Sequence, residues 1–292
     1  MDRHLRCAQV LALHLPGNSS TLAVPTRSEL LRNQKKSRLK SVRNKTSRRH
    51  RVAHRSGFAP ALGAAHAGSQ NGRSTLSERV YQALKRDIIR GLHPSGEALG
   101  EKGLAKMYRG SRTPVREAAV RLQQDSLLRI VPNRGYFVSS MTIGWLNEIY
   151  EFRAAVESAC AELAARKAAD QALLEKLAAL ARTEYETNDF ASYERFIHAD
   201  TQFHIGIARL TRNPMLVRAV ADMRCHMERV MYAAIDIGYY GEAPVQEHEV
   251  IIQAIRNQDA DLARKLMYDH ILQSRSKVLG LANGEAHVPS SH

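Results

Sequence analysis

The chain has 292 residues, 44% of them hydrophobic, and a formal net charge of +14 at pH 7. This length and apolar content suffice for two domains with separate cores. A transmembrane helix is excluded because no run of 18 apolar residues occurs, and the distant Cys7, Cys160 and Cys225 argue against a disulfide framework or a cysteine zinc site. The early stretch AQVLALHLPG is poor for a secretory signal, since it is short, is broken by His14 and precedes a basic segment, so we expect a cytoplasmic protein.

The charge is divided unevenly along the chain. Residues 1–73 carry +13, residues 74–140 carry +6 and residues 141–292 carry −5. The first segment has no apolar period that would offset the entropy of ordering, so we expect a disordered basic tail at 1–73. This tail is either a basic arm that grips phosphates or an uninformative tail from an over-extended gene start. A basic front half and a mildly acidic back half indicate nucleic acid at one end and another task at the other.

Residues 74–140 predict three helices followed by a β-hairpin. Apolar residues recur with helical spacing from Leu76, and a second, shorter helix is expected near residues 101–108. The third begins at Thr113-Pro114, with Thr113 as the N-cap and Pro114 as the first helical residue. The strand-like segments LLRIV and YFVSS flank PNRG, where a glycine supplies the turn conformation. Three helices plus a hairpin define a winged helix-turn-helix domain.

The start of the third predicted helix concentrates basic and hydroxyl side chains in SRTPVREA. A helix N-terminus presents unpaired N–H groups to phosphate, and arginines such as Arg112 and Arg116 can pair with guanine in the major groove. Arg134-Gly135 at the hairpin tip is placed to enter the neighbouring minor groove. A solvated basic face is the alternative for each residue alone, but helix order, Thr-Pro start and wing together favour DNA binding.

Beyond Met141 the strand pattern stops and amphipathic helices follow. Their expected ranges are 142–168, 171–187, 189–211, 214–236, 244–257 and 259–280. We therefore expect an all-helical effector-binding and dimerisation domain over residues 141–281 and a second disordered tail at 282–292. The predicted fold class is mainly α: an N-terminal winged helix-turn-helix of three helices plus a β-hairpin, joined to an all-helical bundle.

The helical half also contains a candidate metal site. Asp200 and His204 are four residues apart, so on a helix both side chains reach one ion. His248 and His270 lie on later predicted helices beside apolar residues. One carboxylate and three imidazoles suit zinc, nickel or manganese, with positions left for water or a ligand oxygen. Spacing alone leaves open an ordinary Asp–His surface or capping pair with structural core histidines.

The segments VYQALKRDIIRGLHPSGEAL, GLAKMY, SRTPVREA and NRGYFV resemble the winged DNA-binding domain of GntR-type bacterial transcription regulators. The resemblance implies that the two helix arginines read bases or clamp phosphates and that the neighbouring hydroxyls touch the DNA backbone. The expected DNA-binding residues are Lys102, Ser111, Arg112, Thr113, Arg116, Arg134 and Gly135. The chain departs from the family at Arg109-Gly110, where a glycine and an aliphatic residue are usual, and at Ser126, where glycine is common. We expect the first departure to loosen the turn between helices and the second to matter little.

The segments IYEFRAAVESACAELAA, DTQFHIGIARLTRNP, EHEVIIQAI and ARKLMYDHI are similar to the FadR C-terminal domain, called FCD. Many FCD domains bind a metal with one Asp and three His, and the matching positions here are Asp200, His204, His248 and His270. The subgroup that binds fatty acyl thioesters lacks this set, so the resemblance implies a small organic acid as effector.

Arg153 lies in EFRAAVE, where arginine in related domains often faces the effector cavity. A guanidinium can hold a carboxylate with two hydrogen bonds while a metal takes another oxygen. The alternative for Arg153 is an ion pair with Glu151, Glu157 or another bundle carboxylate.

Together these patterns predict a ligand-responsive regulator, interpreted as a repressor, that binds double-stranded operator DNA. One recognition helix reads only a short half-site, so a homodimer is implied. A small carboxylic acid is the expected effector, and no membrane partner is expected. The alternative is a metal-dependent enzyme, a hydrolase or oxygenase acting on a small organic acid. Against it, no general base accompanies the ligands in a matching motif, and a DNA-reading domain is fused to the site.

Overall fold

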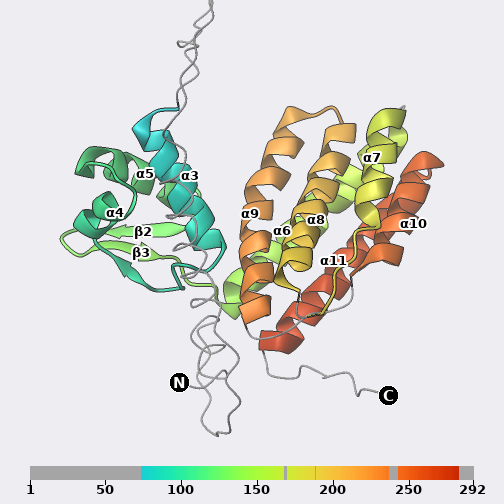
Figure 1. The fold of residues 1–292 in the computed structure, drawn as a ribbon. Coiled ribbons are helices and arrows are strands. Elements are labelled where there is room, and N and C mark those ends of the chain that lie inside the picture. Colours follow the sequence, from blue (N-terminus) through green and yellow to red (C-terminus); the bar gives the residue numbers. More distant parts are fainter. Residues whose placement is uncertain (1–73, 168–169, 188, 237–242, 283–292) are drawn as a thin grey trace, which may run out of the picture.

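The computed structural model describes residues 74–167, 170–187, 189–236 and 243–282, and Figure 1 shows its two parts side by side. The tails predicted at both ends lie outside these residues, except that Ala282 is helical. Within the described ranges, no helix is both long and apolar enough to span a membrane.

The first part packs three helices against a small sheet, the winged unit (Figure 1). Its helices are α3 (Leu76–Ile89), α4 (Glu101–Met107) and α5 (Arg112–Gln124). Its strands are β1 (Ala98–Leu99), β2 (Leu128–Val131) and β3 (Gly135–Val138), antiparallel in the order β1-β3-β2. The predicted helices and hairpin are confirmed. The two-residue β1 was missed because it is too short to show a periodic pattern.

A single apolar core holds the winged unit together. Leu84 and Ile88 of α3, Val115 and Leu122 of α5, and Val138 of β3 are each fully buried in it. Burying one such side chain contributes about 1.5–3 kcal/mol. The polar faces of the same helices therefore point to solvent, and the predicted DNA contacts lie on these faces.

Helix α5 begins earlier than predicted. Ser111 is its N-cap in an extended conformation, and Arg112 is the first helical residue, so the prediction of Thr113 as the cap was wrong. Pro114 is consequently the third helical residue. It is tolerated there because the first four N–H groups of a helix have no intrahelical partner.

Both departures from the family pattern fall at left-handed backbone positions. Arg109 has φ 53° and Ser126 has φ 58°, each directly after the C-cap of a helix. The turn after α4 is nevertheless closed by a 2.9 Å hydrogen bond from Gly110 N–H to the Ala105 carbonyl. The left-handed conformation costs about 1–2 kcal/mol for a residue with a Cβ atom, which explains why glycine is usual at such positions.

Arg109→Gly is expected to raise the free energy of unfolding of the winged unit by about 0.5 kcal/mol. Relief of left-handed strain outweighs the entropy that glycine adds to the unfolded chain. Urea unfolding followed by circular dichroism measures the change. The control is Gln82→Gly in the middle of α3, at an exposed helical position, which should lower stability by about 1 kcal/mol. If both substitutions destabilise equally, Arg109 is not strained.

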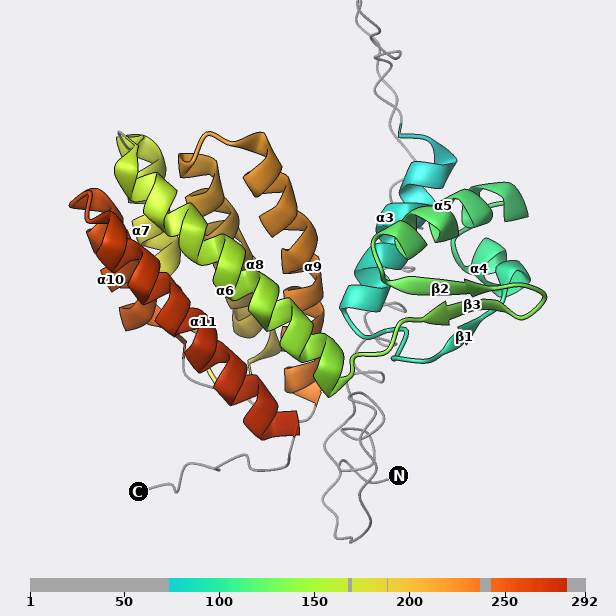
Figure 2. The same cartoon turned by 180° about the vertical axis from the view of Figure 1, so that it is seen from behind.

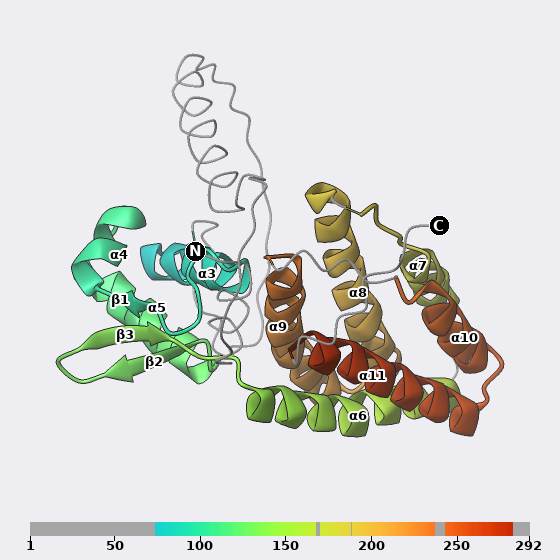
Figure 3. The same ribbon diagram turned by 90° about the horizontal axis from the view of Figure 1, so that it is seen from below.

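The second part is an all-helical bundle (Figures 1 and 2). Its helices are α6 (Ile143–Arg166), α7 (Gln171–Ala181), α8 (Phe190–Leu210), α9 (Pro214–Asp236), α10 (Val245–Arg256) and α11 (Ala260–Ala282). Figure 2 shows α6 and α11 packed along each other, and Figure 3 shows α6 leading from the hairpin beneath the bundle. The predicted fold class, a winged helix-turn-helix joined to a helical bundle, is confirmed.

The connection between α7 and α8 differs from the prediction. Helix α7 was expected to run to residue 187 but ends at Ala181. Tyr185 leaves the helical path and packs against Tyr193 and Phe196, with ring centroids 4.6 and 4.8 Å away. The Glu186 N–H also donates to the hydroxyl of Ser192 at 3.0 Å. Tertiary contacts of one aromatic residue thus override its helical propensity.

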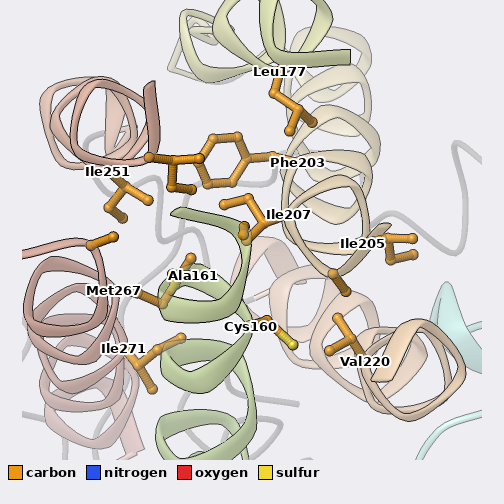
Figure 4. Packing of buried hydrophobic residues seen from close by; sticks show 14 of the residues in the cluster. Cys160, Ala161, Leu177, Phe203, Ile205, Ile207, Val220, Ile251, Met267 and Ile271 are labelled. Atoms are coloured by element: carbon orange, nitrogen blue, oxygen red, sulfur yellow. The ribbon is translucent and has the colours of Figure 1, made fainter. Parts of the chain in front are cut away.

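The bundle core is continuous across its helices (Figure 4). Phe203 and Ile207 of α8 lie among Leu177, Ile251 and Met267 from three other helices, all buried. Such a core fixes the inward faces of α8, α10 and α11, the helices that carry the predicted metal ligands.

Helix α9 contacts the winged unit. Buried Arg229 donates to the Ser95 hydroxyl at 3.0 Å and to the Ser139 carbonyl at 2.6 Å. Burial lowers the pKa of Arg229 to about 10. Arg90, the C-cap of α3, pairs with Glu194 of α8 beside this contact.

His226 of α9 lies beside this junction with its ring 5.6 Å from that of Trp145. Burial, and secondarily Arg229, lowers the pKa of His226 to about 4. The imidazole is therefore neutral in the folded protein, whereas in the unfolded chain it accepts a proton below about pH 6.5.

We expect acid to destabilise the fold partly through His226. Because its folded pKa lies below its unfolded pKa, stability is complete above about pH 6.5 and falls as the pH drops towards 4, by about 2 kcal/mol at pH 5. In His226→Gln the loss of stability between pH 7 and pH 5 should be smaller than in wild type by about that amount. His198→Gln, at an exposed position, is the control and should behave as wild type. Equal acid sensitivity in His226→Gln would contradict this assignment.

Candidate DNA-binding surface and metal centre

The predicted DNA contacts are exposed on the winged unit. Ser111, Arg112, Thr113 and Arg116 lie at the start of α5. Lys102 lies exposed in the first turn of α4.

The hairpin tip is formed by Asn133, Arg134 and Gly135. Gly135 has φ 96°, so it supplies the left-handed turn conformation as predicted. A Cβ atom there would also lie 3.2 Å from the carbonyl of Leu99, which is close enough to disturb strand β1. Arg134 is exposed, with its guanidinium 5.8 Å from the ring centre of Phe137.

Glu101 of α4 holds the two helix arginines, a feature that the sequence analysis missed. Its carboxylate lies 2.8 Å from Nε of Arg116 and 3.8 Å from Nε of Arg112. The hydrogen bond from Arg116 and the charges of both arginines lower the pKa of Glu101. Two arginines that share one carboxylate can exchange it for a phosphate, which also offers anionic oxygens that accept hydrogen bonds from arginine.

Three predicted metal ligands meet inside the bundle. His204 of α8, His248 of α10 and His270 of α11 are buried, and each offers a ring nitrogen within 4.8 Å of the others. The rings of His248 and His270 have centroids 4.7 Å apart. The three histidines are far apart in the sequence, and the packing of the three helices brings them together.

Asp200, the fourth predicted ligand, borders the same cluster. Its Oδ1 lies 3.7 Å from Nε2 of His204 and 3.7 Å from Nε2 of His248. Its other oxygen pairs with buried Arg224. Burial opposes ionisation of Asp200, but Arg224 and the histidines outweigh it and hold the pKa of the carboxyl below its usual range.

Two carboxylates lie behind the histidines. Glu157 contacts Nδ1 of His204, and Oε2 of Glu247 lies 2.7 Å from Nδ1 of His270. A carboxylate on one ring nitrogen leaves the other for a metal and fixes the ring's orientation. The sequence analysis assigned neither residue to the metal site, because nothing in the local pattern links Glu157 to a histidine 47 residues later.

The donor set fits a divalent cation. The buried Nε2 atoms of His204 and His248 have no hydrogen-bond partner. Burial lowers the pKa of His204 to about 4 and that of His248 well below its usual range, so both imidazoles are neutral. In a neutral imidazole the ring nitrogen that carries no proton can bind a metal, and leaving such a buried nitrogen without a partner is costly. Nitrogen donors with one carboxylate suit zinc, nickel or manganese.

A cavity of about 110 Å³ opens beside this cluster and reaches Asp200 and His270. Arg153 and Arg224 also line it. Nε of Arg153 donates to Glu157 at 2.8 Å, so the ion pair foreseen as the alternative is present. Nη1 of the same guanidinium is buried without a hydrogen-bond partner, so Arg153 also has a donor left for a ligand.

The remaining histidines of the bundle lie elsewhere. His198 borders a wider cleft of about 790 Å³ lined by residues of α3, α7, α8 and α9. His226 faces Trp145 at the domain junction. Neither joins the metal cluster among the described residues. Arg224, by contrast, was missed as a site residue because α9 carries no recognisable motif around it.

The exposed basic helix start and hairpin of the winged unit are typical of a DNA-binding transcription regulator, and the helical bundle forms a separate domain. Residues 76–138 match the bacterial regulatory proteins of the gntR family, and residues 148–273 match the FCD domain. The chain belongs to the GntR family of bacterial transcription regulators and carries an FCD domain.

Relatives agree with this assignment. The chain is 25% identical to the HTH-type transcriptional repressor RspR of Escherichia coli K12, over 71% of this chain and 91% of RspR. It is 28% identical to the Uxu operon regulator of Haemophilus influenzae, over 71% and 83%. A solved GntR structure from Rhodococcus sp. RHA1 has the same fold, with a TM-score of 0.58 and 24% identity over 70% of this chain and 97% of that one. Because families and relatives are transcription regulators, the enzyme alternative is set aside.

Proposed function

We propose that this regulator holds one divalent metal ion in its FCD domain and uses it to sense a small carboxylic acid. Asp200, His204, His248 and His270 would bind the ion. The observation that carries the proposal is the pair of buried, neutral and unpartnered imidazole nitrogens beside a cavity lined by two arginines. When bound, the ion supplies a coordination position for a ligand oxygen.

The charges around the cavity favour an anionic effector. Arg153 is paired with Glu157 and Arg224 with Asp200, so the charges of the two ion pairs balance. A bound dication adds positive charge that these side chains do not neutralise. A carboxylate restores the balance and accepts a hydrogen bond from Nη1 of Arg153, which otherwise has no partner.

Operator DNA is the proposed partner of the winged unit, through the seven residues predicted from the sequence, of which all but the half-buried Gly135 are exposed. A homodimer places two such units on successive half-sites. Its formation is supported by the exposed apolar side chains of Phe152 on α6 and of Tyr268 and Leu272 on α11, two helices that pack together. We place the protein in the cytoplasm, where operator DNA is found, and infer repression by analogy with RspR, which is named as a repressor.

The proposal is tested with the purified full-length chain. Its metal content is measured first, and a DNA fragment that it binds is selected from a random library. Titration with acetate, citrate, D-gluconate and phenylacetate should change DNA affinity for at least one acid, and removal of the metal with a chelator should abolish that response. A chain without metal that cannot be reloaded, or a response that survives chelation, would contradict the metal-dependent sensor.

A further inference from the structure

The effector cavity has two chemically different ends. The charged end is formed by Arg153, Asp200, Arg224, His270, Glu247 and Lys277. The other end lies between α8 and α9, and its lining residues are Tyr185, Tyr193, Phe196, Met227, Val230, Met231 and Ala234. Among these described residues, none carries a charge or an amide. We call this second end the apolar end.

The sequence of α8 places both ends on one helix face. Tyr193, Phe196 and Asp200 are spaced three and four residues apart, so their side chains project from the same side. With a rise of about 1.5 Å per residue, Tyr193 lies about 10 Å along the helix from Asp200. A ligand anchored at Asp200 therefore extends along Phe196 towards Tyr193.

Helix α9 repeats the arrangement in the opposite chain direction. The ion pair between Arg224 and Asp200 sets the two helices in register. Met227, Met231 and Ala234 then follow Arg224 along α9, at three, seven and ten residues, on the face that lines the cavity. Both helices consequently change from charged to apolar in the same direction through space.

An aromatic cluster closes the apolar end. Tyr185 packs against Tyr193 and Phe196, and the rings of Tyr193 and Phe196 are 5.8 Å apart. Tyr193 and Phe196 are buried. Ring faces and methionine side chains pack well against apolar groups and adapt to their shape.

We propose that the effector is a carboxylic acid with a compact apolar or aromatic tail, and not a polyhydroxylated acid. The inference rests on the proposed function, because the carboxylate is assigned to the metal and arginine end. Each hydroxyl of a sugar acid would lose its water at the apolar end and would need a new partner there, whereas an apolar tail gains from the same desolvation. The cavity of about 110 Å³ is smaller than the apolar cavity of about 150 Å³ that holds one benzene, so it excludes a tail larger than one ring.

The test is calorimetric titration of the metal-loaded, full-length protein with four probes: phenylacetate, acetate, D-gluconate and the uncharged phenylacetamide. Phenylacetate is expected to bind at least tenfold more tightly than each of the other three. Acetate lacks the apolar tail, D-gluconate replaces it with a hydroxylated chain, and phenylacetamide keeps the tail but lacks the negative charge.

Met231→Gln places an amide of similar size in the apolar end and is expected to weaken phenylacetate binding about tenfold while leaving acetate binding unchanged. Met215→Gln is the matched control, because Met215 lies on the same helix and is 74% exposed. Ala234→Leu fills the same end without a polar group and should also weaken phenylacetate selectively, which keeps the test valid if Met231→Gln does not fold.

Metal-dependent binding of D-gluconate that is tighter than that of phenylacetate overturns this inference and leaves the proposed sensor intact. Unchanged phenylacetate affinity in both Met231→Gln and Ala234→Leu overturns it as well. Binding of no acid by a metal-loaded protein overturns the proposed function together with the inference.

Discussion

His270→Ala is expected to leave the purified protein with less than about a tenth of the wild-type metal content. The substitution removes one of three imidazoles whose nitrogens lie within 4.8 Å of one another. His270 is the best position for this test, because Glu247, which it leaves behind, retains Lys277 at 3.5 Å as a partner. His204→Ala would instead leave buried Glu157 without its histidine.

The loss of metal should also lower stability. An ion that binds only the folded state adds about 4 kcal/mol when its concentration is 1,000 times its dissociation constant. The thermal unfolding temperature of the wild type should therefore fall when a chelator is added, whereas that of His270→Ala should stay the same. His198→Ala, at an exposed position outside the cluster, is the control and should keep both metal and chelator response. If His270→Ala retains full occupancy, or wild type cannot be loaded with zinc, nickel or manganese, the histidines are structural.

Arg116→Ala is expected to weaken operator binding by about 1–3 kcal/mol if the guanidinium pairs with a base. If it neutralises a phosphate instead, the loss of affinity should be similar for all DNA sequences. The slope of log affinity against log salt concentration should then fall in magnitude by about one. Arg112→Ala should behave in the same way, because both arginines share Glu101 as their partner at the start of α5. DNA titrations at two salt concentrations distinguish base contacts from phosphate contacts.

Arg264→Ala is the matched control for the DNA contacts. Arg264 is also an exposed helix arginine paired with a glutamate, Glu162, but it lies on α11 of the bundle. It should bind the operator as wild type does. Wild-type affinity in both Arg112→Ala and Arg116→Ala would remove α5 from the proposed DNA surface.

Local patterns predicted the parts of the fold that depend on neighbouring residues. The apolar spacing around Leu84 and Leu122 predicted helices. Gly135 predicted the hairpin tip, and the structure shows the left-handed backbone that favours glycine there. The start of α5 was misplaced because Thr113-Pro114 resembles a cap while Ser111 carries the extended conformation. Local pattern gives the type of an element more securely than its ends.

The candidate site was only partly predictable, because its residues interact between elements. Asp200 and His204 share a turn of one helix, so their spacing reveals them. Glu101, Glu157 and Arg224 instead find their partners through helix packing, 15, 47 and 24 residues away. No periodicity encodes such contacts.

Arg229 reduces the free-energy cost of separating the winged unit from the bundle, although the apolar contacts of Ile89 with Tyr193 and Phe196 oppose separation. Its hydrogen bonds go to a hydroxyl and a carbonyl, neither of them charged, although the guanidinium is buried. Separation of the two parts returns this cation to water, which offsets the bonds that are broken. Each part keeps its own apolar core when the junction opens. An effector that favours one orientation of the winged unit by about 3 kcal/mol changes the ratio of two orientations more than a hundredfold.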